Sequence, residues 1–284
     1  MNSSVKDFLR EKICFYSPIL GANNFKSLIG LAKEHGVRGV EFLNYGEMTT
    51  PDMAAARELG RLARENGLLI PCFSVGLNLV GEDRKEKISD VKRYAEICSE
   101  LEIPYLHHTV AFKFTKPYDV AGMGRNFALG VEATQEIAEY ANRLGVKTVL
   151  EDQAFIVNGV QGYSKFREAA GNCFDVLLDT GNIYFVDETA GAFAEAFADS
   201  IVHTHVKEYY YTETKPEREP CYLTWGDKYL SNAIAGEGDV DYDRVKAALK
   251  KVNYKGVYSM EYSIKHEEEL HRTFGYLASV FADL

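Results

Sequence analysis

Eight short apolar or β-branched runs alternate with longer segments of helical periodicity along the whole chain. This alternation is typical of a parallel sheet whose strands are joined by crossover helices. Eight strand-then-helix units predict an α/β fold of the closed (β/α)8 type, a TIM barrel, whose usual size of about 250 residues suits this chain. The predicted strands are residues 12–17, 39–44, 68–75, 103–110, 146–153, 174–180, 201–208 and 256–262.

The segments between these runs carry the start and stop signals of helices. "PDMAAARELGRLAREN" (51–66) has proline in its predicted first turn and ends just before Gly67, at a C-cap position. "DYDRVKAALKKV" begins at Asp241, a predicted N-cap. Since no linker, low-complexity tract or charge block divides the chain, we expect a single TIM-barrel domain over residues 1–284.

A long aromatic connection follows the seventh predicted strand, from about residue 209 to 239. It holds several tyrosines and the single tryptophan, Trp225. A connection of this length inside a compact domain is usually a functional lid or a binding wall. A disordered insertion is the alternative, but it would leave these aromatic side chains in water, which is unfavourable.

Composition and charge narrow the classes of partner. A formal net charge of -10 argues against binding to nucleic acid or to an anionic membrane surface. The five scattered cysteines form no CxxC pair, so neither a disulfide framework nor a zinc knuckle is indicated. The polar start "MNSSVKDFLREK" lacks a signal-peptide core, and no apolar run approaches about 18 residues. We expect a soluble cytoplasmic protein with a small-molecule partner, and a homo-oligomer is left open.

Polar residues at the ends of four successive strands are the candidate functional site, because a TIM barrel places its active site at the carboxyl ends of its strands. These residues are Glu151, Asp179, His205 and Glu261. Strand alternation predicts that Val202, Thr204 and Val206 pack against outer helices while His203, His205 and Lys207 point into the barrel. His205 is nearer the rim, so we expect His203 to be packed or to support the site from behind.

The four rim residues predict a metal site. Taken singly, an acidic residue at a strand end is more often a helix cap or an ion-pair partner, and a strand histidine is more often packed. Three carboxylates at one barrel mouth would repel one another strongly without a bound cation. Three carboxylates and one imidazole form a mostly hard site that suits one divalent ion, with Mn²⁺ favoured over Mg²⁺, Co²⁺ or Zn²⁺.

The motifs "VLEDQ", "LLDTGN", "HVKE", "GEGDVDY" and "GVYSMEY", in this order, resemble the xylose isomerase-like barrels of the sugar phosphate isomerase/epimerase family. The resemblance covers essentially the whole chain and implies a metal quartet of Glu151, Asp179, His205 and Glu261. It also implies that Glu151 and Glu261 are the catalytic proton-transferring pair. Glu208 stands where the family usually has aspartate. Asn182 and Tyr211 replace a histidine and an arginine of ketose 3-epimerases, which argues against tagatose- or psicose-type activity.

The resemblance implies a divalent-metal-dependent isomerase or epimerase of a ketose or related keto sugar. Such an enzyme removes a proton next to a carbonyl and stabilises the enediolate on the metal. A metal-dependent lyase or dehydratase acting on a keto sugar or cyclitol is the alternative. An endonuclease IV-like hydrolase and a non-catalytic sugar-binding barrel are less favoured. The hypothesised substrate contacts are Asn182, His107, Lys207, Glu208 and Trp225. For His107 and Trp225, ordinary packing is an equal alternative.

Overall fold

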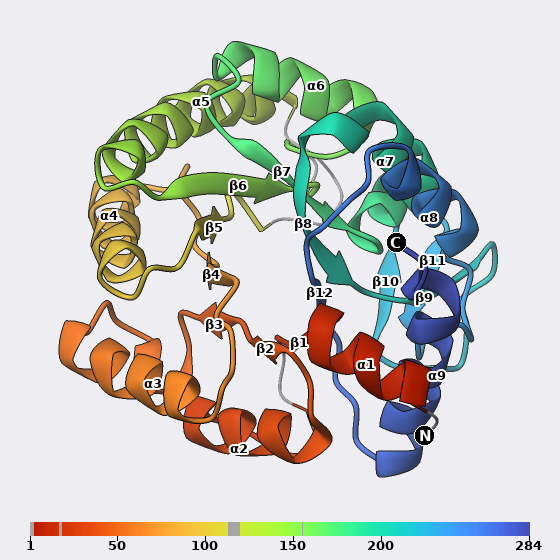
Figure 1. The fold of residues 1–284 in the computed structure, drawn as a ribbon. Helices are drawn as coiled ribbons and strands as arrows, with labels where there is room; N and C mark the ends of the chain where they lie inside the picture. Colours follow the sequence, from red (N-terminus) through yellow and green to blue (C-terminus); the bar gives the residue numbers. More distant parts are fainter. Residues whose placement is uncertain (1–2, 17–18, 113–119, 155) are drawn as a thin grey trace.

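The computed structural model describes residues 3–16, 19–112, 120–154 and 156–284. Its main sheet contains nine parallel strands in the order β2-β1-β12-β8-β7-β6-β5-β4-β3, surrounded by helices (Figure 1). The two outermost strands of this order, β2 and β3, are halves of the second predicted strand, separated at Glu41. The sheet therefore closes on itself, and the predicted (β/α)8 barrel is confirmed.

All eight predicted strands are present, each shorter than its sequence pattern. The barrel strands are β1 (Ile13–Phe15), β2 (Gly39–Val40), β3 (Phe42–Leu43), β4 (Cys72–Val75), β5 (Tyr105–His108), β6 (Lys147–Glu151), β7 (Asp175–Asp179), β8 (Ile201–Val206) and β12 (Tyr258–Met260). The residues that follow each strand enter the loops at the rim of the barrel, where a TIM barrel carries its functional side chains.

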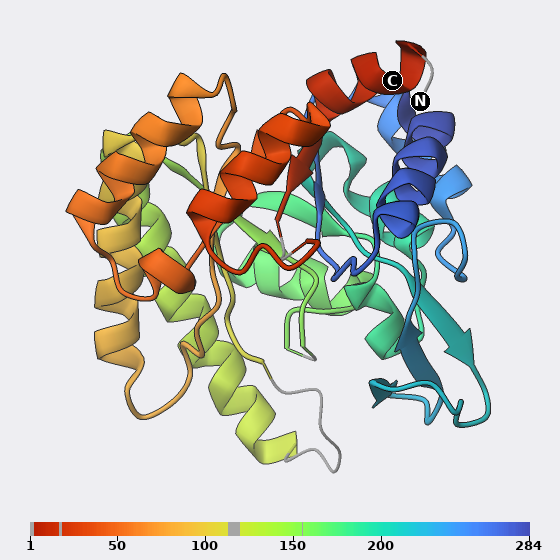
Figure 2. The same ribbon diagram turned by 90° about the horizontal axis from the view of Figure 1, so that it is seen from below.

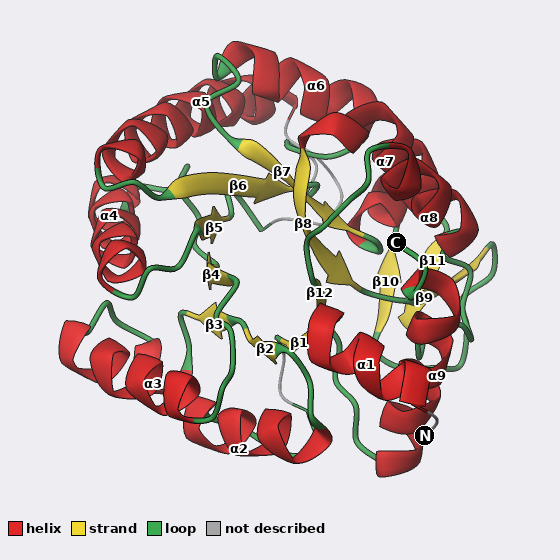
Figure 3. Ribbon diagram, in the orientation of Figure 1, coloured by secondary structure: helices red, strands yellow, loops and turns green. Residues whose placement is uncertain are grey.

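Helices form the outer layer of the barrel (Figure 3). They are α1 (Ser3–Lys12), α2 (Phe25–His35), α3 (Met53–Glu65), α4 (Arg84–Glu100), α5 (Val120–Arg143), α6 (Val160–Ala169), α7 (Ala190–Phe197), α8 (Tyr242–Lys251) and α9 (Glu267–Phe281). Short 3-10 turns in the described residues are η1 (Gly46–Met48), η2 (Asn182–Val186) and η3 (Ala198–Ser200). No helix within these described ranges is long and apolar enough to cross a membrane.

Two predicted helix starts differ in detail from the structure. Pro51 lies outside α3, because the carboxylate of Asp52 accepts hydrogen bonds from the N–H groups of Ala54 and Ala55 and so starts the helix at Met53, two residues later than expected. Asp241 occupies the predicted N-cap of α8, but its side chain makes no capping bond. Its Oδ1 accepts instead from the N–H of Gly191, 2.9 Å away, which joins α8 to the start of α7.

The side chains of β8 depart from simple alternation at Val202. The pairing of β7 with β8 shifts between Val176 and Leu177, so that Ile201 and His203 have partners in β7 while Val202 has none. Such a bulge re-aims the side chain at the extra residue. Val202 packs with Leu177 in a small cluster separate from the main core, and the prediction that it packs against outer helices is wrong.

The connection after β8 folds into a second, antiparallel sheet with the order β10-β11-β9. Its strands are β9 (Tyr209–Thr212), β10 (Cys221–Leu223) and β11 (Tyr229–Asn232). Figure 2 shows this sheet projecting from the same end of the barrel as the first turns of α5. Residues 209–239 thus add ordered structure beside the rim, and the disordered alternative is wrong.

Candidate metal and active site

The ends of four neighbouring strands bring the predicted quartet together. Glu151 and Asp179 are the last residues of β6 and β7, His205 lies near the end of β8, and Glu261 directly follows β12. In the parallel register His205 lies beside Asp179 on one side and beside Ser259 on the other. One metal-capable atom from each quartet residue lies within 4.8 Å of the other three. The four predicted residues are therefore neighbours around one point.

Each member of the quartet directs one buried atom toward this point that makes no hydrogen bond of regular geometry, and the ammonium of Lys207 lies 2.9 Å from one of them, Asp179 Oδ2. Among the described residues, buried atoms without a hydrogen bond include Glu151 Oε2, Asp179 Oδ2, His205 Nδ1 and Glu261 Oε2. Glu261 Oε2 and His205 Nδ1 approach to 2.8 Å as an ion pair, but without the geometry of a hydrogen bond. Three carboxylate oxygens and one imidazole nitrogen that converge in this way fit a divalent ion with oxygen and nitrogen ligands.

The turn after β7 fixes the orientation of Asp179. Its Oδ1 accepts hydrogen bonds from the N–H groups of Gly181 (2.7 Å) and Asn182 (2.8 Å), which leaves Oδ2 for the quartet. A Cβ atom at Gly181 would lie 2.7 Å from the ring of Tyr209 and 2.9 Å from Cγ of Lys207. This turn therefore needs glycine for close packing, in addition to the aspartate itself.

Lys207 reaches the quartet from beyond β8. Its ammonium lies 2.9 Å from Asp179 Oδ2, 2.9 Å from Glu261 Oε1 and 3.1 Å from Asn182 Oδ1. Burial lowers the pKa of Lys207, but these carboxylates outweigh it and hold the pKa well above its usual value. The structure thus places Lys207 and Asn182, two predicted substrate contacts, at the quartet, with a permanent positive charge between the carboxylates.

The two glutamates of the quartet differ in proton affinity. Burial, reinforced by the charge of Glu261, raises the pKa of Glu151 to about 7. Burial acts in the same direction on Glu261, but Lys207 and His205 outweigh it and lower its pKa below the usual range. Two neighbouring carboxyl groups with separated pKa values suit opposite acid and base roles.

Glu41 lies directly behind His205 and was not among the predicted site residues. It sits at the interruption between β2 and β3, fully buried. Its Oε1 is 2.9 Å from His205 Nε2, its Oε2 is 2.7 Å from His203 Nε2, and Oε1 accepts a 2.6 Å hydrogen bond from Ser74. Burial raises the pKa of Glu41, but His205 and His203 outweigh it, so that its pKa is well below the usual value.

The sequence did hold a signal for Glu41, since it is an acidic residue in the middle of the apolar run "GVEFLN". The structure also explains the second histidine of β8. His203 lies one layer below His205 and contacts Glu41, so its predicted place behind the site agrees with the structure. A carboxylate that holds the far nitrogen of an imidazole fixes the tautomer and orientation of the nitrogen that faces the site.

His107 and Tyr16 complete the wall around His205. His107 is buried, with Nδ1 2.9 Å from Ser74 Oγ and Nε2 3.8 Å from Glu151 Oε1. Burial, together with the charge of His205, lowers the pKa of His107 well below its usual value, so this imidazole is neutral. Tyr16 was also not among the predicted site residues, and the centroid of its ring lies 4.5 Å from the centroid of the His205 ring.

The remaining two predicted substrate contacts lie in or beside the connection 209–239. Glu208 is buried, and its carboxylate accepts hydrogen bonds from the N–H groups of Gly236 (2.9 Å) and Val240 (3.0 Å). The structure therefore uses Glu208 to anchor the connection and does not bring it to the quartet. Trp225 lies between β10 and β11 with 46% of its surface exposed, and its backbone N–H donates to the carbonyl of Phe185.

Comparison with known proteins identifies the family to which this barrel belongs. Residues 29–279 match the model of the xylose isomerase-like TIM barrel family. The chain belongs to this family. A curated relative, D-psicose 3-epimerase of Agrobacterium fabrum, is 22% identical over 234 residues, which cover 77% of this chain and 72% of the relative.

Similar solved structures share the barrel along nearly its whole length. 3-keto-D-glucoside 4-epimerase from E. coli superposes with a TM-score of 0.72 at 16% identity, covering 95% of this chain and 98% of that one. D-allulose 3-epimerase from Methylomonas superposes with a TM-score of 0.66 at 19% identity, covering 96% and 93%. At these identities the likeness establishes the fold, and the choice of substrate has to come from the site.

Proposed function

We propose that this chain is a divalent-metal-dependent isomerase or epimerase of a ketose or a related keto sugar. The observation that carries the proposal is the set of four buried metal-capable atoms within 4.8 Å of one another, one from each quartet residue, in which the two glutamates have unlike pKa values. The relatives described above add support, because they are named as epimerases of psicose, allulose and a 3-keto-glucoside.

Glu151, Asp179, His205 and Glu261 would hold the ion. Three carboxylate oxygens and one imidazole nitrogen favour Mn²⁺, with Mg²⁺, Co²⁺ and Zn²⁺ as alternatives. A divalent ion bound there acts as a Lewis acid that polarises a sugar carbonyl and makes the adjacent C–H bond more acidic. Glu41 supports the set, because its contact with His205 Nε2 leaves Nδ1 to face the carboxylates.

Proton transfer falls to the two glutamates. Glu151 and Glu261 both approach His205 Nδ1, at 3.5 Å and 2.8 Å, so both carboxylates border the same small volume. One takes the proton from the carbon next to the carbonyl, and the other returns a proton to the opposite face, which inverts the centre. Return to the neighbouring carbon instead would give an isomer, so the outcome depends on how the sugar is held.

Lys207 and Asn182 are the proposed substrate contacts nearest the quartet. Lys207 can donate to a sugar oxygen while it neutralises the carboxylates, and Asn182 has a buried amide nitrogen without a hydrogen bond. Tyr211, at the position of the epimerase arginine, donates its hydroxyl proton to Asp187. These differences favour a keto sugar other than psicose or tagatose. His107 and Trp225 are secondary candidates for contact.

The test measures the exchange of hydrogen for deuterium at the carbon next to the carbonyl of a sugar. Protein loaded with Mn²⁺ is incubated in D₂O with ketoses, inososes and 3-keto-glucosides, and deuterium incorporation and products are followed by NMR. We expect exchange with at least one class, and a loss of about 10²- to 10⁴-fold for Glu151→Gln or Glu261→Gln. Release of water from the sugar would identify a dehydratase. A metal-loaded protein that exchanges no substrate of the panel would contradict the proposal.

A matched control separates catalysis from folding. Glu208→Gln changes a buried glutamate close in sequence to the quartet, but one whose oxygens accept only backbone N–H groups among the contacts described. The amide keeps one acceptor oxygen, and we expect exchange within a few-fold of wild type. Equal losses in Glu208→Gln and Glu261→Gln would show that the assay reports damage to the fold and not the loss of a proton-transferring group.

A further inference from the structure

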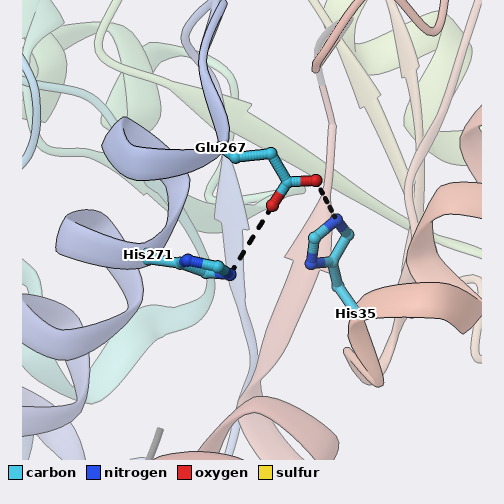
Figure 4. A group of neighbouring side chains, drawn as sticks. All are labelled: His35, Glu267 and His271. Atoms are coloured by element: carbon cyan, nitrogen blue, oxygen red, sulfur yellow. Dashed lines mark ion pairs between the residues drawn. The ribbon is translucent and has the colours of Figure 1, made fainter.

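A second cluster of metal-capable side chains lies on the outer layer of the barrel. His35, Glu267 and His271 each offer one ligand atom, and these atoms lie within 4.8 Å of one another. His35 is the last residue of α2, while Glu267 begins α9 and His271 lies one turn later on the same helix. Figure 4 shows both imidazoles directed at the Glu267 carboxylate from the two helices.

The spacing of these atoms is that of ligands around an ion and not that of hydrogen bonds. His35 Nε2 lies 3.9 Å from Glu267 Oε1, and His271 Nε2 lies 3.6 Å from Glu267 Oε2. A hydrogen bond would bring such atoms to about 2.7–3.2 Å. Two ligands each about 2.1 Å from a tetrahedral Zn²⁺ are about 3.4 Å apart, so a small side-chain adjustment places an ion among all three.

An independent observation concerns His35 alone. Only 8% of its side chain is exposed, and Nε2, the atom directed at Glu267, is buried without a hydrogen-bond partner. The ring is held in place by packing, with Phe274 and Phe15 edge-on at centroid distances of 6.1 and 6.4 Å. A buried imidazole nitrogen that is fixed in position and unsatisfied is a costly arrangement unless something binds to it.

We propose that His35, Glu267 and His271 form a second metal site, specific for a borderline transition-metal ion such as Zn²⁺. Two imidazoles and one carboxylate suit Zn²⁺, Co²⁺ or Ni²⁺ better than Mg²⁺ or Mn²⁺, in contrast to the oxygen-rich quartet. Glu267 and His271 are 61% and 51% exposed, so water can complete the coordination and the ion can enter from solvent. The ion would join α2, near the start of the chain, to α9, near its end.

The experiment measures Zn²⁺ and Co²⁺ binding to protein freed of metal by a chelator. A His205→Ala protein removes the imidazole of the quartet, and calorimetry with Zn²⁺ should then show one remaining ion per chain. Adding His271→Ala should weaken that binding at least 30-fold. Co²⁺ should give the visible absorption of a tetrahedral complex, which His271→Ala abolishes. A double variant that binds Zn²⁺ as tightly as His205→Ala alone would overturn the proposal.

Two controls keep the test decisive. Glu267→Gln should lose Zn²⁺, whereas Glu268→Gln, which removes the next carboxylate of the same helical turn, should retain it. Should His205→Ala not fold, wild type and His271→Ala are compared directly, and the variant is expected to bind one ion fewer. Zn²⁺ in about 100-fold excess over its Kd should also raise the Tm several degrees more in wild type than in His271→Ala, which keeps only the quartet. Equal stoichiometry in these two proteins would refute the second site.

Discussion

Replacing Glu41 by glutamine should weaken metal binding without removing any proposed ligand. Within the quartet, the hydrogen-bond contact of Glu41 is with His205, whose Nε2 lies 2.9 Å from Glu41 Oε1. The substitution keeps the size of the side chain and one carbonyl-type acceptor, but it removes the negative charge that two imidazoles share. The expected effect therefore isolates the orientation and basicity of His205.

The magnitude follows from the kind of bond that is lost. A carboxylate held against an imidazole N–H is a charge-assisted hydrogen bond, about twice as strong as a neutral one. Loss of such a partner behind a metal ligand typically lowers affinity by about 10- to 100-fold, or about 1.4–2.7 kcal/mol. We expect the Kd for Mn²⁺ to rise within this range in Glu41→Gln.

The assay is calorimetric titration of metal-free protein with Mn²⁺, followed by the exchange rate at saturating Mn²⁺. If Glu41 acts only by positioning His205, saturating ion should restore most of the rate of Glu41→Gln. Ser74→Ala is the matched control, because it removes the 2.6 Å hydrogen bond to Glu41 and leaves both imidazole contacts in place. Its Kd should stay within a few-fold of wild type. A Glu41→Gln protein of native stability with unchanged Kd would refute the positioning role.

Three further predictions concern pH and packing. Burial lowers the pKa of His205, but its carboxylate neighbours outweigh it and raise that pKa well above its usual value; an entering ion must displace this proton, so Mn²⁺ affinity should increase from pH 6 to 8. A flat profile in calorimetry would contradict this. Burial raises the pKa of Glu208 to about 7, above its unfolded value, so its stabilising contribution is complete at low pH and is lost as the pH rises through 7. Urea unfolding of Glu208→Gln should show a weaker decline in stability between pH 5 and 8 than wild type, and an identical decline would argue against this assignment. Gly181→Ala should destabilise the protein by about 1–3 kcal/mol and reduce exchange, because its Cβ would meet Tyr209 at 2.7 Å. Gly162→Ala, in open space on α6, should do neither, and similar losses in both would exclude the steric explanation.

The sequence predicted the barrel and the quartet because both depend on strong local patterns. Strand runs alternate with helical segments, and parallel strands end at one rim, so residues at those ends had to meet. Glu151, Asp179 and His205 could thus be identified as neighbours without coordinates. Lys207 followed from alternation along the predicted strand 201–208, and the structure places its ammonium 2.9 Å from Asp179, just beyond the end of β8.

The features that escaped prediction depend on contacts between distant segments. Glu41 is 164 positions from His205 in the chain, and only barrel closure brings the two together. The bulge at Val202 depends on the register between β7 and β8, which the residues of β8 alone do not specify. Glu208 directly follows Lys207, yet its carboxylate turns to the backbone of residues 236 and 240, because successive side chains in an extended segment point in opposite directions.

The two histidines of β8 show how one residue separates a proposed ligand from its support. His203 and His205 point into the barrel about 7 Å apart along the strand, and both direct Nε2 at Glu41. Only His205 has Glu151 and Glu261 at its Nδ1, because the carboxylates stand at the rim and not one layer below. Elemental analysis of the purified proteins should therefore find Mn²⁺ in wild type and none in His205→Ala. His203→Asn should retain the ion, and its loss of Mn²⁺ affinity should be no larger than that of Glu41→Gln, because His203 influences the ion only through Glu41. If His203→Asn lost the ion while His205→Ala kept it, the assignment of the two histidines would have to be reversed.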